Sequence, residues 1–264
     1  MNHILIILHK EWLELRQQRG LVAGMVALPL LFALLPLVAL LGSGATEMSS
    51  VEMNDLPPSA LVNPALAGLS PIELVQAMVG QQLSMLFVLL PIILPSIIAS
   101  YTIVGEKTGR TLEPLLATPV RTWELLAGKS LMAVLPSVLL TWLAAGIFAA
   151  EVALLAVSPQ VVAAVLTPGW ALVMLLCAPL LVTIAVAGMV AVSSRVNDPR
   201  TAQQYSAVGI VPFMMLFFGQ LAGVVVLGPL AALVGALVLA LLAVLALWGA
   251  TQLFQREVIL TRWR

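Results

Sequence analysis

The longest uncharged stretch of the chain runs from Thr201 to Gln255 and holds no Asp, Glu, Lys or Arg in 55 consecutive residues. About 20 apolar residues are enough for one helix to cross a hydrocarbon layer of roughly 30 Å. The stretch can therefore form two membrane spans, joined by a tight turn near Gly228-Pro229. Only 9% of the 264 residues are charged, whereas soluble domains carry about 25%. The chain is thus predicted to be an all-α membrane protein.

Six apolar segments are long enough to cross a membrane as helices, and they form one transmembrane domain over residues 1–264. The predicted spans are residues 21–41, 83–104, 130–157, 170–192, 207–227 and 229–252. Ser70, Pro71 and Glu73 are typical of a helix start, so a short helix is expected to run from Pro71 into the second span. Residues 158–169 are too short and too rich in proline for a further span, with a re-entrant turn as an alternative.

The segment before the first span, residues 1–19, is predicted to be an interfacial helix. Its apolar face consists of Ile4, Leu8, Trp12 and Leu15 at helical spacing, and Lys10, Glu14 and Gln17 lie opposite. Such a helix can lie in the headgroup layer with Trp12 as its anchor. The alternative is a cytoplasmic extension of the first span.

The charges orient the predicted spans. All twelve Lys and Arg residues fall in four segments, namely 1–19, 105–129, 193–206 and the tail from Arg256. The remaining connections hold five acidic residues and no basic one. Because basic residues accumulate on the cytoplasmic side, both termini are predicted to be cytoplasmic, which requires an even number of spans. The chain is therefore expected to be a multi-pass protein of the cytoplasmic membrane.

The pattern of missing residues excludes several kinds of chemistry. No charge lies near the middle of a predicted span, which argues against an ion-coupled carrier with buried carboxylates. His3 and His9 do not share a helix face at metal spacing, and Cys177 is the single cysteine, so no metal or cofactor site is predicted. Gly128-Lys129-Ser130 matches the end of a phosphate-binding loop, but Trp123 replaces the required glycine. Lys129 is therefore interpreted as an interfacial anchor, and the chain alone is predicted not to be an enzyme.

The charged stretch 105–129, between the second and third predicted spans, is predicted to contain a short amphipathic helix. Thr111 is a suitable N-cap, and Glu113 then lies near the positive end of the helix dipole. Pro119 disfavours helix at Thr118, which limits the helix to about two turns. The helix has an apolar ridge and a charged surround, which consist of Leu112, Leu115 and Leu116, and of Glu106, Lys107, Arg110 and Arg121.

A helix of two turns is too short to be stable alone, so its ridge must pack against something. One possibility is that it packs on the helix ends of this same chain. The other is that it fits a groove on a cytoplasmic partner, as in helix-in-groove recognition. A new helix is expected to start near Thr118 or Thr122 and to run into the third span.

The stretch GEKTGRTLEPLLATPVRTWELLAGK closely resembles the first cytoplasmic loop of ABC-2 type transporter permeases. The matching residues are Thr111, Leu112, Glu113, Leu115, Leu116, Thr118, Pro119, Glu124, Leu125, Gly128 and Lys129. Val196-Asn197-Asp198-Pro199-Arg200 and the tail from Leu253 to Glu257 are similar to further patterns of this family. Pro114 departs from the family pattern and could shorten the short helix.

The resemblance implies that the chain is the transmembrane subunit of an ABC exporter, with the short helix as its coupling helix. The implied ATPase contacts are Thr111, Leu112, Glu113, Leu115, Leu116, Thr118 and Pro119, supported by Glu106, Arg110, Arg121, Asn197, Asp198 and Arg200. ATP and Mg would bind to a separate cytoplasmic ATPase, present in two copies. A second permease copy, as a homodimer or a heterodimer, and the lipid bilayer are the other implied partners, without nucleic acid. The alternative is a non-transporting membrane module that uses the ATPase for signalling or for extracting lipids or proteins.

Overall fold

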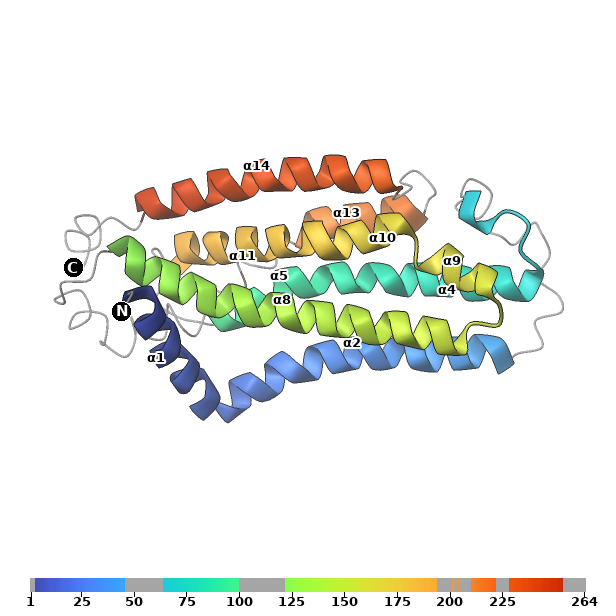
Figure 1. Cartoon of the computed structure of the whole chain (residues 1–264), viewed down its shortest axis with the longest axis horizontal. Helices are drawn as coiled ribbons and strands as arrows, with labels where there is room; N and C mark the ends of the chain where they lie inside the picture. The colour runs from blue at the N-terminus through green and yellow to red at the C-terminus, as the bar shows by residue number, and fades with distance from the viewer. Residues whose placement is uncertain are drawn as a thin grey trace.

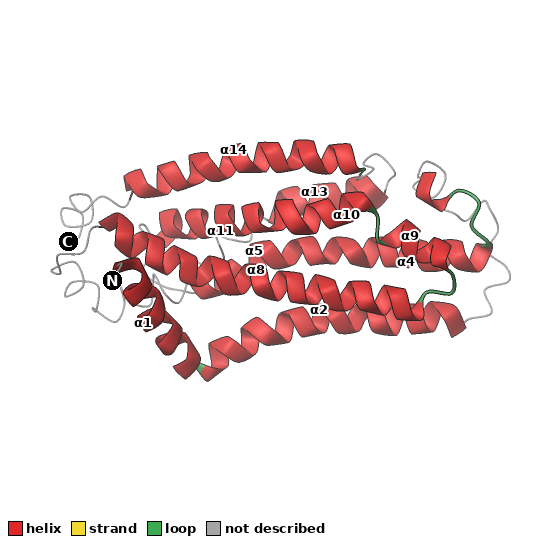
Figure 2. Cartoon of the chain, viewed as in Figure 1, coloured by secondary structure: helices red, strands yellow, loops and turns green. Residues whose placement is uncertain are grey.

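The computed structural model describes residues 3–45, 64–99, 122–193, 201, 204, 210–221 and 228–253. Helix accounts for most of these residues, and within these ranges there is no strand (Figure 2). Five helical segments are long and apolar enough to cross a membrane. They are Arg19–Gly42, Pro71–Ala99, Glu124–Leu155, Pro168–Val192 and Pro229–Ala250. The predicted all-α membrane class is therefore confirmed.

The spans lie side by side in an elongated bundle (Figure 1). In chain order the elements are α1 (His3–Gln17), α2 (Arg19–Ala45), η2 (Pro64–Leu66), α4 (Pro71–Leu86), η3 (Phe87–Leu89), α5 (Leu90–Ala99), α8 (Thr122–Leu155), α9 (Pro159–Val165), α10 (Pro168–Leu172), η5 (Val173–Cys177), α11 (Ala178–Ser193), α13 (Ile210–Leu221) and α14 (Pro229–Leu253). Helix α8 packs against α2, α5 and α11, and α11 also packs against α14. We call the two ends of the bundle the α1 end and the α9 end, after the short helices that lie there.

The starts of two helices agree with the sequence-based predictions. Helix α4 begins at Pro71, where the Ser70 backbone N–H and hydroxyl each donate a hydrogen bond of 2.8 Å to the Glu73 carboxylate. It continues through η3 into α5, so the short helix and the second span form one segment. Helix α8 begins at Thr122. Gln18 separates α1 from α2, which turn away from each other (Figure 1), and the extension of the first span is therefore excluded.

The region between the third and fourth spans contains more structure than the sequence predicts. Residues Pro159–Val165 form the short helix α9, which packs against α4. The hydroxyl of Ser158 caps it by accepting a hydrogen bond from the Val161 backbone N–H. Helix α10 then begins at Pro168, with Thr167 as its cap. The predicted fifth span, 207–227, lies partly outside the described residues, which place α13 within it.

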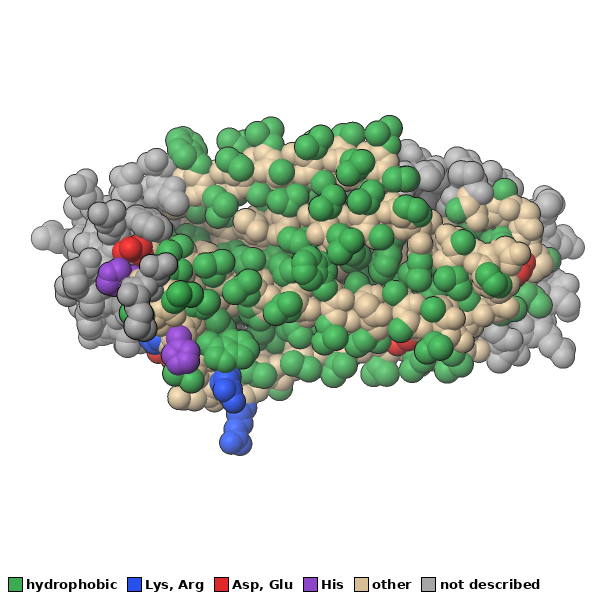
Figure 3. Space-filling model, viewed as in Figure 1, with side chains coloured by type: hydrophobic (Ala, Val, Ile, Leu, Met, Phe, Trp, Pro, Cys, Tyr) green, Lys and Arg blue, Asp and Glu red, His purple; other side chains and the backbone are tan. Residues whose placement is uncertain are grey.

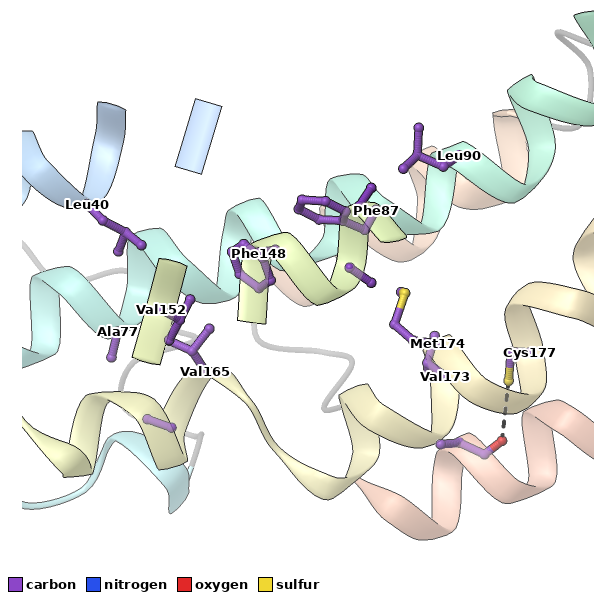
Figure 4. Close-up of a cluster of buried hydrophobic side chains, with 14 of the residues drawn as sticks. Leu40, Ala77, Phe87, Leu90, Phe148, Val152, Val165, Val173, Met174 and Cys177 are labelled. Atoms are coloured by element: carbon purple, nitrogen blue, oxygen red, sulfur yellow. Dashed lines mark hydrogen bonds between the residues drawn. The ribbon is translucent and has the colours of Figure 1, made fainter. Parts of the chain in front are cut away.

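The buried side chains form two separate hydrophobic clusters along the bundle. The α9-end cluster includes Phe87 and Phe148, whose ring centroids lie 4.9 Å apart (Figure 4). The α1-end cluster includes Leu15, Ile98 and Val182. Large apolar side chains cover much of the face of the bundle shown in Figure 3. An apolar exterior is the surface that a hydrocarbon environment requires.

Candidate functional site at the α1 end of the bundle

The residues predicted to contact an ATPase lie outside the described residues. This holds for Thr111, Leu112, Glu113, Leu115, Leu116, Thr118 and Pro119, and for Glu106, Arg110, Arg121, Asn197, Asp198 and Arg200. The structure does place the two helices that flank the segment 100–121. Ala99, at the end of α5, and Leu126, near the start of α8, belong to the same α1-end cluster. The predicted coupling segment is therefore anchored at the α1 end on both sides.

Helix α1 packs on the first turns of α8, close to the point where this segment ends. Its Leu15 is buried in the α1-end cluster, and Ile7 lies against Gly128 of α8. A Cβ atom on Gly128 would come within 2.7 Å of Ile7 Cγ2 and 2.9 Å of Ile7 Cβ. Contacts this close show that the glycine allows α1 and α8 to approach each other directly.

A buried ion pair joins the same two helices. Lys129 Nζ donates a hydrogen bond of 2.9 Å to Glu11 Oε1, and both side chains are only 3% exposed. Lys10 Nζ lies 3.3 Å from the same oxygen and 3.0 Å from Glu14 Oε1, so α1 adds a second cation at its surface. An ion pair that is largely removed from water requires a fixed geometry, because separating its charges leaves them poorly solvated. The pair therefore holds α1 in one position on α8.

One sequence-based interpretation needs correction at this site. Lys129 is not an anchor exposed to the headgroup layer, because it is buried against α1 and bound to Glu11. Trp12, the expected anchor in the headgroup layer, is 46% exposed, whereas Glu11 and Leu15 of the same helix are buried. Its anchoring role stays a prediction.

Glu11 is the functional residue that sequence reasoning missed. A signal for it exists, because Glu11 lies three residues after Leu8 and four before Leu15, in the middle of the apolar stripe. A charge in that position is expected to have a buried partner. The sequence does not say which partner, since Lys129 lies 118 residues away along the chain.

The described residues of the α1 end make packing contacts and a charge pair. Within the described ranges, no group of three or more His, Cys, Asp or Glu residues could hold a metal ion. The described histidines, His3 and His9, are exposed on α1.

A family model described as "ABC-2 family transporter protein" matches residues 5–235. The match includes α1, the segment between α5 and α8, and the helices that pack around them. No curated protein matches the chain.

Proposed function

Because the chain belongs to the ABC-2 family of transporter proteins, we propose that it is the transmembrane subunit of an ABC exporter driven by a separate ATPase. The family match and the five apolar spans identify it as a multi-pass membrane component of a transporter. The match over residues 5–235 is the observation that supports the finer proposal most strongly. The ATPase partner and the outward direction of transport belong to this proposal.

We assign the α1 end to the cytoplasm. Every Lys and Arg among the described residues lies there, namely Lys10, Arg16, Arg19 and Lys129, whereas Glu73 and Glu151 lie toward the α9 end. Basic residues accumulate on the cytoplasmic side of membrane proteins. Lys129 and Glu151 are 22 residues apart on α8, which corresponds to about 33 Å of helix. This spacing fits a hydrocarbon core of roughly 30 Å between the two charges.

The proposed coupling element is the apolar ridge of Leu112, Leu115 and Leu116 in the segment between α5 and α8. A groove on the ATPase would receive this ridge, and ATP and Mg would bind to the ATPase alone. Because the segment leads directly into α8 at Thr122, its displacement would move α8. The Glu11–Lys129 pair would then carry α1 along with α8. Two permeases, identical or different, and two ATPases form the proposed complex, with six spans in each permease.

The coupling role is tested by replacing Leu115 and Leu116 with Asp in the permease co-expressed with its ATPase. We expect the ATPase to stop co-purifying, because two carboxylates cannot be buried in an apolar groove without a large cost. The control variant, Leu115→Met with Leu116→Met, keeps the ridge apolar and is expected to retain the ATPase. Unchanged assembly and unchanged activity in the Asp variant would refute the role. ATP-dependent substrate flux in proteoliposomes separates a transporter from a non-transporting module.

The orientation is tested with single cysteines in a Cys177→Ser background. A cysteine at Ser59 is expected to react with a membrane-impermeant thiol reagent added to whole cells, because it follows the first span on the outer side. A cysteine at Arg121 is expected to react only after the membrane is opened. The opposite pattern would reverse the assignment of the α1 end.

A further inference from the structure

Two neighbouring spans change from α-helix to another helix type inside the bundle. The second span contains the 3-10 segment η3, and the fourth span contains the π-helical segment η5. Phe148 of α8 lies next to both, with its ring centroid 4.9 Å from that of Phe87 and 5.7 Å from that of Trp170. Phe87 begins η3, and Trp170 lies three residues before η5. Short π segments within α-helices frequently mark functional positions.

The π segment has an identifiable cause and an identifiable partner. The Ala178 backbone N–H donates its hydrogen bond to the Val173 carbonyl, five residues earlier, and not to the Met174 carbonyl, four residues earlier. The next residue is Pro179, which has no N–H to offer. The Met174 carbonyl accepts a hydrogen bond of 2.9 Å from the indole Nε1–H of Trp142 on α8. Trp142 therefore satisfies a backbone carbonyl that Pro179 cannot.

Prolines occur in four spans near the boundary between the two hydrophobic clusters. In α2, Pro29 lies next to the boundary, since Met25 belongs to the α1-end cluster and Leu28 packs against the α9-end cluster. Pro36 lies within the α9-end half, between Phe32 and Leu40. In the other three spans a proline also lies at the boundary, namely Pro95 between Leu94 and Ile98, Pro136 between Ala133 and Ala144, and Pro179 between Cys177 and Val182. We call Pro29, Pro95, Pro136 and Pro179 the proline layer.

The proline layer separates two packed halves of the bundle in four spans, whereas α14 continues from one half into the other without an internal proline. A proline inside a helix removes one backbone hydrogen bond and favours bending at that level. On the α1 side, α5 packs against α11, and α1 packs against α8. Each half has its own buried cluster, and Leu140 of α8 packs against both clusters.

The half at the α9 end is held together by two buried or half-buried amides and one close contact. Gln76 of α4 donates to the Leu155 carbonyl at 3.2 Å and accepts from the Val157 N–H at 2.8 Å. Gln81 donates to the Ala164 carbonyl of α9 at 2.8 Å. A Cβ atom on Gly80 would come within 2.6 Å of Val165, so α4 and α9 are in direct contact. These contacts join α4, α9 and the end of α8 into one unit, which we call the α9-end unit.

We propose that the proline layer is a hinge across the membrane and that Trp142 is the positioning residue that holds it in the observed arrangement. The α9-end unit then tilts against the helices of the α1 end when the Trp142–Met174 hydrogen bond is released. The role of the ATPase cycle in driving this tilt rests on the proposed function. The hinge itself does not depend on it. Trp142 acts through the Met174 carbonyl. Removing the indole donor is therefore expected to release the hinge, and supplying a backbone N–H to the same carbonyl is expected to hold it.

The hinge is tested by pulsed EPR distances between pairs of spin labels in the full chain, reconstituted in lipid nanodiscs in a Cys177→Ser background. Serine keeps a donor for the Ala232 carbonyl, which the Cys177 thiol reaches at 3.6 Å. One pair, at Leu131 and Ala163, crosses the proline layer between exposed positions. The control pair, at Leu154 and Ala163, joins exposed positions near or within the α9-end unit.

Trp142→Phe keeps an aromatic ring and removes the donor. We expect the Leu131–Ala163 distribution to gain a second population in this variant, while the Leu154–Ala163 distribution keeps one. Adding Pro179→Ala supplies a backbone N–H to Met174 and is expected to restore the single population. If Trp142→Phe alone does not yield folded protein, the yield of the double variant Trp142→Phe with Pro179→Ala decides. A folded double variant supports the positioning role of Trp142, and equal loss of folded protein in the single and the double variant overturns it.

Three further results overturn the hinge. They are an unchanged Leu131–Ala163 distribution in Trp142→Phe, equal broadening of both pairs, and a second population that Pro179→Ala does not remove. In the complex with the ATPase, nucleotide is expected to shift the Leu131–Ala163 distance of the otherwise unaltered chain. If no ATPase assembles, the proposed function fails while the effect of Trp142→Phe on the isolated permease still decides the hinge.

Discussion

The buried pair between Glu11 and Lys129 allows a quantitative test of how α1 is held on α8. Removing one partner of a buried ion pair typically costs about 3–5 kcal/mol, because the remaining charge stays out of water. Glu11→Gln leaves the Lys129 ammonium at a site where it is 3% exposed and lacks this carboxylate. Lys129→Met is expected to cost less, since Lys10 Nζ lies 3.3 Å from the same Glu11 oxygen and can still neutralise it.

The matched control lies on the same helix at nearly the same distance. Lys10 and Glu14 are 3.0 Å apart, but their side chains are 40% and 49% exposed. Exposed pairs of this kind contribute about 0.2–1 kcal/mol, so Glu14→Gln is expected to change stability little. Burial is therefore the main difference between the two pairs.

The assay is thermal melting of the purified permease, followed by intrinsic tryptophan fluorescence. About 1 kcal/mol shifts the melting temperature by roughly 2–4 °C for a chain of this size. Glu11→Gln is thus expected to lower it by about 10 °C, and Glu14→Gln by no more than about 4 °C. The double variant Glu11→Gln with Lys129→Met is expected to lose less than the sum of its singles, because neither charge remains. Equal losses for Glu11→Gln and Glu14→Gln would refute the reasoning, as would an additive double variant.

Three further substitutions test the contacts at each end of the bundle. Gly146→Ala is their control, because the added methyl group meets open space. This control should leave stability unchanged or raise it by up to about 1 kcal/mol through helix propensity. Gly128→Ala adds a methyl group against α1 and should lower the melting temperature and increase proteolysis of the N-terminal helix. Gly80→Ala adds a methyl group against α9. It should lower the melting temperature and increase proteolytic cleavage between α8 and α10. A melting temperature equal to that of Gly146→Ala would contradict the close contact between α4 and α9. Gln76→Leu removes the hydrogen-bond partner of the Leu155 carbonyl and of a backbone N–H in the same turn. Each unsatisfied group is expected to cost about 1–3 kcal/mol. An unchanged melting temperature would show that water replaces the amide.

Much of the architecture was predictable because it depends on local properties of the chain. A run of about 20 apolar residues has one favourable state in lipid, which is a helix, since its backbone groups must bond to each other. This is why the first four predicted spans and the last one correspond to helices of the structure. The start of α4 at Pro71 was also predictable, because Ser70 and Glu73 act within a single turn.

The coupling residues show the limit of the same reasoning. Leu112, Leu115 and Leu116 form a ridge by spacing alone, and the family match covers them. Their role as an ATPase contact stays a prediction, because these residues lie outside the described ranges. The sequence likewise predicted the charge difference between the two membrane sides, which the described Lys and Arg residues at the α1 end support.

The sequence by itself determined where helices can cross the membrane and which family the chain resembles, because hydropathy and motifs are local. Only the tertiary structure decided that Glu11 pairs with Lys129 and that Trp142 bonds to the Met174 carbonyl. Both contacts join residues on different helices, and the energy of each depends on burial and on distances of about 3 Å. Helix packing sets such distances, so a linear pattern identifies the groups that need partners but not the partners themselves.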